Sequence, residues 1–350
     1  MLSKNNKCPL FGFAPNLLDI LADLIYNNAM ANSSNKNDNL QINPIITPAS
    51  SGLCFSIATI AIIAMSLIFT VVIAIIATAK GVALEQFNAS LQDSFLYNIF
   101  AFGLSSVALC FALLVFAGVK KIRPFSMLHL KKTGLKYWVI ALLLTFGLLF
   151  GFTELNNLFV SLLEKIGYSK PDMSLQNEKW YHLAVWLVVA AAMPAFFEEC
   201  VFRGYLLEGL KQYGTLFYVI VGGLFFSIFH QNPQQTPYQF ICGMAFTLLA
   251  IKSGSMLPCI AMHFANNATI LITDFCSLTI GKTAGIILTV AGILCFLGGI
   301  IWLMLDKKST LSTEENPVKP TKTHFLLFSA AGLAVCVLMW LTDLFTYIGG

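Results

Sequence analysis

The chain has 350 residues, of which 57% are hydrophobic and only 11% are charged, and its formal net charge is +4. Soluble domains carry about 25% charged residues, so this composition excludes an ordinary globular protein and a disordered one. Membrane-spanning strands would alternate polar and apolar residues, whereas the apolar runs here are continuous. We therefore predict an all-α, polytopic transmembrane helical bundle. The basic residues lie in short loops between apolar runs, so the positive charge does not indicate a nucleic-acid partner.

The chain begins with a polar stretch that is rich in asparagine, residues 1–52. It lacks the basic start followed at once by an apolar core that a cleavable signal peptide needs. We expect a mostly flexible tail on the cytoplasmic side of the membrane.

Nine apolar runs follow the tail. A helix that spans a bilayer needs about 20 residues, and five of the runs reach that length unaided. The fourth run reaches it only if its helix continues past Pro194 through Arg203, and the fifth and sixth runs are short. We expect eight or nine helices, divided into N-terminal transmembrane helices at 53–163, a membrane core at 180–275 and C-terminal transmembrane helices at 276–350. The runs are 53–79, 95–119, 135–160, 180–197, 216–230, 238–251, 256–274, 284–305 and 325–348.

The charges of the loops predict an orientation. The loop between the second and third runs has six basic residues and no acidic one, and loops of this kind stay in the cytoplasm. With nine spans, the loop at 306–324 also falls inside and the loop at 164–179 falls outside. The sequence thus predicts a multi-pass protein of the cell membrane, with residues 1–52 inside. The six basic residues are Lys120, Lys121, Arg123, Lys131, Lys132 and Lys136.

Two features of the apolar runs are weaker signals. The nine cysteines lie mainly in or beside apolar runs and show no C-x-x-C spacing, so we expect small buried residues and no disulfide framework. Gly147 and Gly151 have the spacing of a close helix contact, but chance pairs of small residues are as common, so we derive no contact from them.

The fourth run contains three charged side chains, Glu198, Glu199 and Arg203. A charge near the centre of a bilayer costs about 2.5–3.5 kcal/mol on insertion scales, so these groups should face a hydrated cavity lined by protein. Residues four apart share a helix face, so Glu199 should pair with Arg203 and leave Glu198 for another partner. Pro194 should kink the helix and help to open the cavity. The plainer alternative is a neutralised pair at a helix end, with both glutamates reaching the interface.

Two later runs add further polar groups. His230 ends the fifth run, and His263 and Asn267 share one face of the seventh. A carboxylate and an imidazole can together bind and deprotonate a water, and a second imidazole with an amide can stabilise an oxyanion. Alternatively, Glu198, His230 and His263 hold a divalent metal such as zinc, which lowers the pKa of a bound water. The sequence leaves both open, although no H-E-x-x-H motif of a soluble zinc protease is present.

The patterns Glu-Glu-x-x-x-Arg, Phe-x-x-x-His and His-x-x-x-Asn, in this order on separate runs, resemble the motifs of the CPBP family. This family comprises CAAX-prenyl proteases and bacteriocin-processing or self-immunity proteins, also called Abi. The resemblance covers about residues 180–275 and includes Phe202-Arg-Gly-Tyr-Leu206 and Lys252-Ser-Gly-Ser-Met-Leu-Pro258. It implies that residues 180–275 are the catalytic membrane core.

The resemblance also assigns roles to the six polar residues. It implies that Glu198 and His230 activate the water and that His263 and Asn267 support the oxyanion. It also implies that Glu199 and Arg203 hold the site in shape.

The activity so implied is that of an intramembrane endopeptidase of the glutamic or metallo type. It would cleave a peptide or protein substrate near the cytoplasmic membrane face, where the active site would open. A non-catalytic bacteriocin immunity or membrane scaffold protein would keep the same fold and bind a peptide toxin instead. A transporter or proton-coupled channel would use the glutamates as a relay, but the chain shows no internal repeat of the kind common in transporters.

Overall fold

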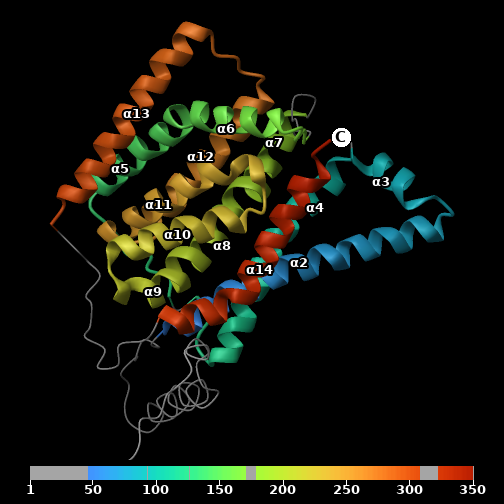
Figure 1. Cartoon of the computed structure of the whole chain (residues 1–350), viewed down its shortest axis with the longest axis horizontal. Coiled ribbons are helices and arrows are strands. Elements are labelled where there is room, and N and C mark those ends of the chain that lie inside the picture. Colours follow the sequence, from blue (N-terminus) through green and yellow to red (C-terminus); the bar gives the residue numbers. More distant parts are fainter. Residues whose placement is uncertain (1–45, 93, 126, 171–178, 308–321, 350) are drawn as a thin grey trace, which may run out of the picture. The chain divides into compact units, whose positions relative to one another are not determined.

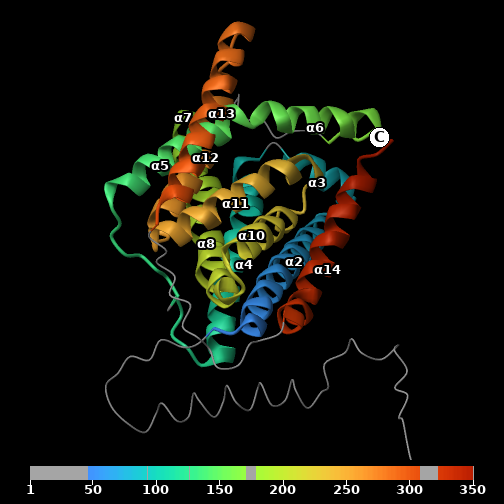
Figure 2. The ribbon, with the colours of Figure 1, turned by 60° about the vertical axis from the view of Figure 1, so that its left-hand side comes forward.

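The computed structural model describes residues 46–92, 94–125, 127–170, 179–307 and 322–349, and regular structure in these residues is helical. The rest of the predicted flexible tail, residues 1–45, lies outside this part of the chain. Figures 1 and 2 show the helices. Their bounds are α2 Pro48–Ala79, α3 Leu84–Gln92, α4 Phe95–Lys120, α5 Leu135–Phe146, α6 Thr153–Lys165, α7 Trp180–Trp186, α8 Met193–Glu199, α9 Leu207–Leu210, α10 Thr215–Phe229, α11 Thr236–Ser253, α12 Leu257–Phe275, α13 Lys282–Leu305 and α14 Lys322–Thr346.

The prediction of an all-α, multi-pass membrane protein is confirmed. Within the described residues, six helices are long and apolar enough to cross a membrane, which is fewer than the eight or nine we expected. The three shorter helices α10, α11 and α12 account for the difference, since α10 has only 15 residues and α11 and α12 have 18 and 19. The six helices that are long and apolar enough to cross a membrane are Pro48–Ala79, Phe95–Lys120, Leu135–Lys165, Trp180–Tyr213, Lys282–Leu305 and Lys322–Thr346.

The helix Trp180–Tyr213, which we call the carboxylate helix, continues past Pro194 as its length required. It is not a uniform α-helix. π-helical turns at Leu187–Ala192 and Cys200–Leu206 lie on either side of α8. A proline has no amide proton and its ring clashes with the carbonyl four residues earlier. The wider π turn just before Pro194 accommodates this defect, and such turns are frequent at functional sites.

Helix α2 begins at Pro48, earlier than the sequence predicted. Thr47 caps it, because its Oγ1 accepts a hydrogen bond of 3.2 Å from the amide of Ser50, and proline suits the first turn. Residues 48–52, which the sequence places in the flexible tail, are helical and buried. They pack against α14 and the end of the carboxylate helix, and α2 and α14 lie side by side in Figure 2.

The glycine pair at 147 and 151 forms a helix contact after all. Together with α5, the π-helix Gly147–Gly151 packs against α13. A Cβ atom added to Gly292 would lie 2.5 Å from the backbone nitrogen of Gly151. Only glycine allows the backbones to approach so closely.

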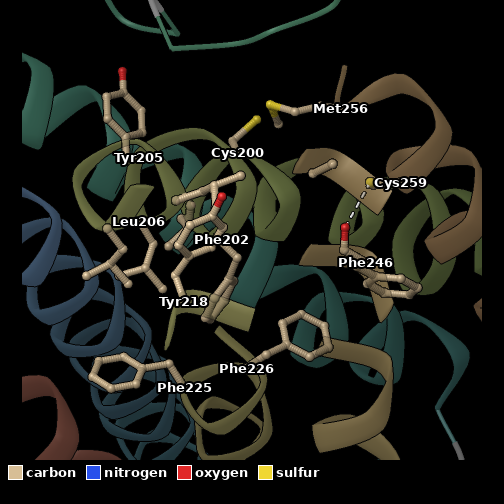
Figure 3. Close-up of a cluster of buried hydrophobic side chains, with 14 of the residues drawn as sticks. Cys200, Phe202, Tyr205, Leu206, Tyr218, Phe225, Phe226, Phe246, Met256 and Cys259 are labelled. Atoms are coloured by element: carbon tan, nitrogen blue, oxygen red, sulfur yellow. Dashed lines mark hydrogen bonds between the residues drawn. The ribbon is translucent and has the colours of Figure 1, made fainter. Parts of the chain in front are cut away.

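One part of the core lies between the carboxylate helix and α10, α11 and α12. Figure 3 shows its aromatic rings, with Phe202 and Phe226 at a centroid distance of 5.1 Å. The prediction of small buried cysteines holds for five of those described, whereas Cys276 is exposed. Cys259 donates its thiol proton to the carbonyl of Phe246 at 3.3 Å. Five cysteines are free and buried, namely Cys54, Cys200, Cys242, Cys259 and Cys336.

The basic loop after α4 lies at the end of the bundle where the carboxylate helix ends. The carbonyl of His129 accepts a hydrogen bond of 2.8 Å from the amide of Met256, and its ring lies 3.4 Å from Glu208. Lys136 pairs with Asp306 at the end of α13, 2.7 Å away. The two loops that we predicted to be cytoplasmic, 120–136 and 306–324, thus begin at one end of the bundle.

Candidate active site

The predicted pair of Glu199 and Arg203 is present and fully buried. Nη1 of Arg203 donates to Oε1 of Glu199 at 2.8 Å, and Nη2 donates to the carbonyl of Gly243 on α11 at 3.0 Å. The guanidinium also lies over the rings of Phe226 and Phe246, 4.6 and 5.1 Å from their centroids. A buried charge is tolerated only when it is paired and hydrogen-bonded. Arg203 therefore joins the carboxylate helix to α10 and α11.

Glu199 also holds the histidine of α12. Nδ1 of His263 lies 3.1 Å from Oε1 of Glu199, the atom that accepts from Arg203. Since a carboxylate oxygen accepts, Nδ1 carries the proton and donates. The ring packs against Phe246, with 5.2 Å between centroids. Glu199 thus sets the orientation of His263, and its own position depends on Arg203.

Glu198 faces both histidines, as its place next to Glu199 suggested. Its Oε2 lies 3.9 Å from Nε2 of His230 and 3.9 Å from Nε2 of His263. Among the described residues this buried oxygen has no hydrogen-bond partner. Both distances are too long for direct hydrogen bonds but suit a bridging water about 2.8 Å from each atom. A buried polar atom without a partner is costly, so this oxygen is placed to receive a water or substrate.

His230 follows α10 as its C-cap residue. Its Nδ1 lies 2.7 Å from the carbonyl oxygen of Phe226. A carbonyl can only accept, so the proton is on Nδ1 and the lone pair of Nε2 faces Glu198. This is the tautomer that a general base needs.

Asn267 lies one turn beyond His263 on the same face of α12. Its Oδ1 accepts a hydrogen bond of 3.3 Å from the side chain of Asn266, whose own Oδ1 accepts from the hydroxyl of Tyr238 at 2.6 Å. Sequence reasoning missed Tyr238 and Asn266. The doublet of asparagines was visible, but no local spacing connects it with a tyrosine 28 residues earlier.

The predicted metal ligands do not fit a bound ion in this arrangement. Zinc binds histidine nitrogens at about 2.0–2.1 Å, so two ligands of a tetrahedral site lie about 3.3 Å apart. The distances from Glu198 to the two histidines are 3.9 Å. No group of three His, Cys, Asp or Glu side chains in the described ranges has the spacing of a metal site. The three side chains would have to move together to hold a metal.

The site lies deep in the bundle. Glu198 precedes Glu208 by ten residues, which is more than two helical turns. Glu208 is in the polar cluster with His129 and Lys211 at the end of the carboxylate helix.

Comparison with known families identifies one segment of the chain. Residues 180–269 match the family described as Rce1-like, Type II CAAX prenyl endopeptidase Rce1-like. This segment is an Rce1-like domain. It begins at the carboxylate helix and ends within α12, so it contains all six predicted site residues. The comparisons with curated proteins and with solved structures found no match to the chain.

The Rce1-like domain confirms the family that the three motifs indicated. An endopeptidase family of this kind, together with the six apolar helices found among the described residues, points to a multi-pass membrane protein of a protease class. Helices α2 to α6, α13 and α14 lie outside the matched residues.

Proposed function

We propose that this protein is an intramembrane endopeptidase in which Glu198 and His230 activate one water for attack on a peptide bond. The observation that carries the proposal is the position of Oε2 of Glu198, which is buried, has no hydrogen-bond partner among the described residues and lies 3.9 Å from Nε2 of both histidines. The family of residues 180–269 supports the same reaction class.

The reaction follows from these positions. Glu198 takes a proton from the water as the water oxygen bonds to the peptide carbonyl carbon, and the carbonyl electrons move to the oxygen. Nε2 of His230 accepts the second hydrogen bond of the water and orients it. When the C–N bond breaks, Glu198 returns its proton to the amide nitrogen, which leaves as an amine.

The oxyanion requires donors on the other side of the carbonyl. His263 and Asn267 supply them, from Nε2 and from the side-chain amide. Because Nδ1 of His263 already donates to Glu199, donation by Nε2 requires protons on both ring nitrogens. The proposed role therefore needs His263 as an imidazolium, and the carboxylate of Glu199 is placed to stabilise that charge.

The test uses the full chain in lipid nanodiscs and a fluorogenic peptide that ends in a farnesylated C-a-a-X sequence, with the same peptide lacking farnesyl as a second probe. We expect cleavage, identified by the mass of the products, and a loss of at least about 100-fold in Glu198→Gln. His129→Ala is the matched control, because this histidine contacts Glu208 outside the site. It should cleave at the rate of the unmodified protein.

The outcomes separate the competing functions. Binding of a probe without cleavage, unchanged in Glu198→Gln, would favour the immunity or scaffold protein. Undiminished cleavage by Glu198→Gln would contradict the proposed mechanism. Cleavage of the farnesylated probe alone would assign prenylated proteins as the substrate class, and equal cleavage of both probes would remove that requirement.

Metal dependence is measured on the same preparation. The spacing of Glu198, His230 and His263 leads us to expect activity that persists in a strong chelator, with no stoichiometric zinc in the purified protein. One zinc per chain, together with activity that chelation removes and zinc restores, would show instead that the three side chains close around an ion.

A further inference from the structure

A hydrogen-bonded chain crosses from α11 to α12 and ends at the proposed oxyanion donor. The two helices are neighbours in Figures 1 and 2. The hydroxyl of Tyr238 donates to Oδ1 of Asn266 at 2.6 Å, and Nδ2 of Asn266 donates to Oδ1 of Asn267 at 3.3 Å. In each of the two hydrogen bonds the earlier residue donates and the next residue accepts, so donation runs from Tyr238 through Asn266 to Asn267.

That direction determines what Asn267 presents to the site. An amide side chain has an oxygen that accepts and a nitrogen that donates, and a rotation of 180° exchanges them. With its oxygen engaged by Asn266, Asn267 keeps its nitrogen for another acceptor. In the reversed orientation it would turn its oxygen toward a developing negative charge, which would repel it.

The middle of the chain is well placed to impose this orientation. Asn266 is 97% buried, so it lacks water as an alternative partner. The first turn of α11 is fixed in turn, because Ser227 donates to the carbonyl of Thr236 at 2.6 Å and Trp340 of α14 donates to its hydroxyl at 2.9 Å. Tyr238 therefore approaches Asn266 from an anchored helix end.

We infer that Tyr238 and Asn266 are positioning residues that hold the amide of Asn267 with its nitrogen toward the oxyanion. The inference rests on the proposed function and extends the site to residues that contact neither water nor substrate. It assigns the orienting role to the hydroxyl of Tyr238 and not to its ring.

Tyr238→Phe removes only that hydroxyl, so it is the test variant. With the farnesylated C-a-a-X probe, we expect kcat to fall about 10-fold, as is usual when a residue that orients a functional ligand is lost. KM should stay the same, because the oxyanion forms only in the transition state. Asn266→Ala should act in the same direction.

Tyr168→Phe is the matched control. The hydroxyl of Tyr168 also makes a hydrogen bond of 2.6 Å, to Asp343, and its side chain is buried beside the last turns of α14. Loss of that hydroxyl should lower thermal stability but leave kcat within about twofold, because no catalytic group depends on it.

A double variant separates positioning from a general loss of structure. In an Asn267→Ala background, Tyr238→Phe should cause no further loss of kcat, since the amide it orients is absent. Wild-type kcat in Tyr238→Phe, or the same 10-fold loss in both backgrounds, would overturn the inference. Failure of the proposed function would look different, because Glu198→Gln would then cleave normally.

Discussion

The buried charges of the site depend on Arg203 more than on any other side chain. Arg203 is the described partner of both Glu199 and the carbonyl of Gly243, and it lies within a cage of aromatic rings. The helical spacing of four predicted the pair with Glu199 from the sequence, whereas the partners on α11 depend on the packing of separate helices. No residue pattern within a single helix indicates which other helices pack against it.

Arg203→Met should therefore destabilise the protein severely. It breaks the buried ion pair with Glu199 by removing one partner, which costs about 3–5 kcal/mol. The midpoint of thermal unfolding in detergent measures the loss. Lys211→Met is the control, because its pair with Glu208 is partly exposed and such pairs contribute about 0–1 kcal/mol. Equal stability of the two variants would contradict the central place of Arg203.

At the scale of elements, hydropathy predicted where the helices run but not how they contact each other. The nine apolar runs correspond to helices because each must satisfy its backbone within the membrane. The π turns beside Pro194 and the contact of Gly147 and Gly151 with α13 were not predictable. Both depend on the neighbouring helix, and a single run of sequence does not identify its neighbour.

The glycine contact gives a prediction with a control on the same helix. Gly292→Ala would place a methyl group 2.5 Å from a backbone nitrogen of the π-helix, so α13 must move away. Such overpacking costs about 1–3 kcal/mol, which the thermal unfolding midpoint would report. A Cβ at Gly298 meets nothing within 4 Å, so Gly298→Ala should be neutral or slightly stabilising. An equal effect of both substitutions would contradict the close contact.

At the scale of the whole molecule, the charges of the loops predict which loops lie on the same side of the membrane. The fold is compatible with that prediction. The basic loop after α4 and the turn before α12 meet at one end of the bundle, through the hydrogen bond of Met256 to His129. Cys276 follows the other end of α12 and is exposed. The assignment of the basic end to the cytoplasm stays a prediction.

Labelling of single cysteines in intact cells tests that topology. In a chain whose other cysteines are replaced, Cys276 should react with an impermeant maleimide added outside. A cysteine at the exposed position Lys132 should react only after the membrane is opened. Labelling of both from the same side would contradict the predicted topology.

The most direct measurement of the central claim is a double-mutant cycle on Glu198 and His230. Two groups that hold one water act as a unit, so losing the second should cost little once the first is gone. We predict that Glu198→Gln, His230→Ala and the double variant cleave the farnesylated C-a-a-X probe at similarly low rates, each at least about 100-fold below the unmodified protein, while remaining folded. Losses that multiply in the double variant, or normal cleavage by either single variant, would show that the two side chains do not share a water.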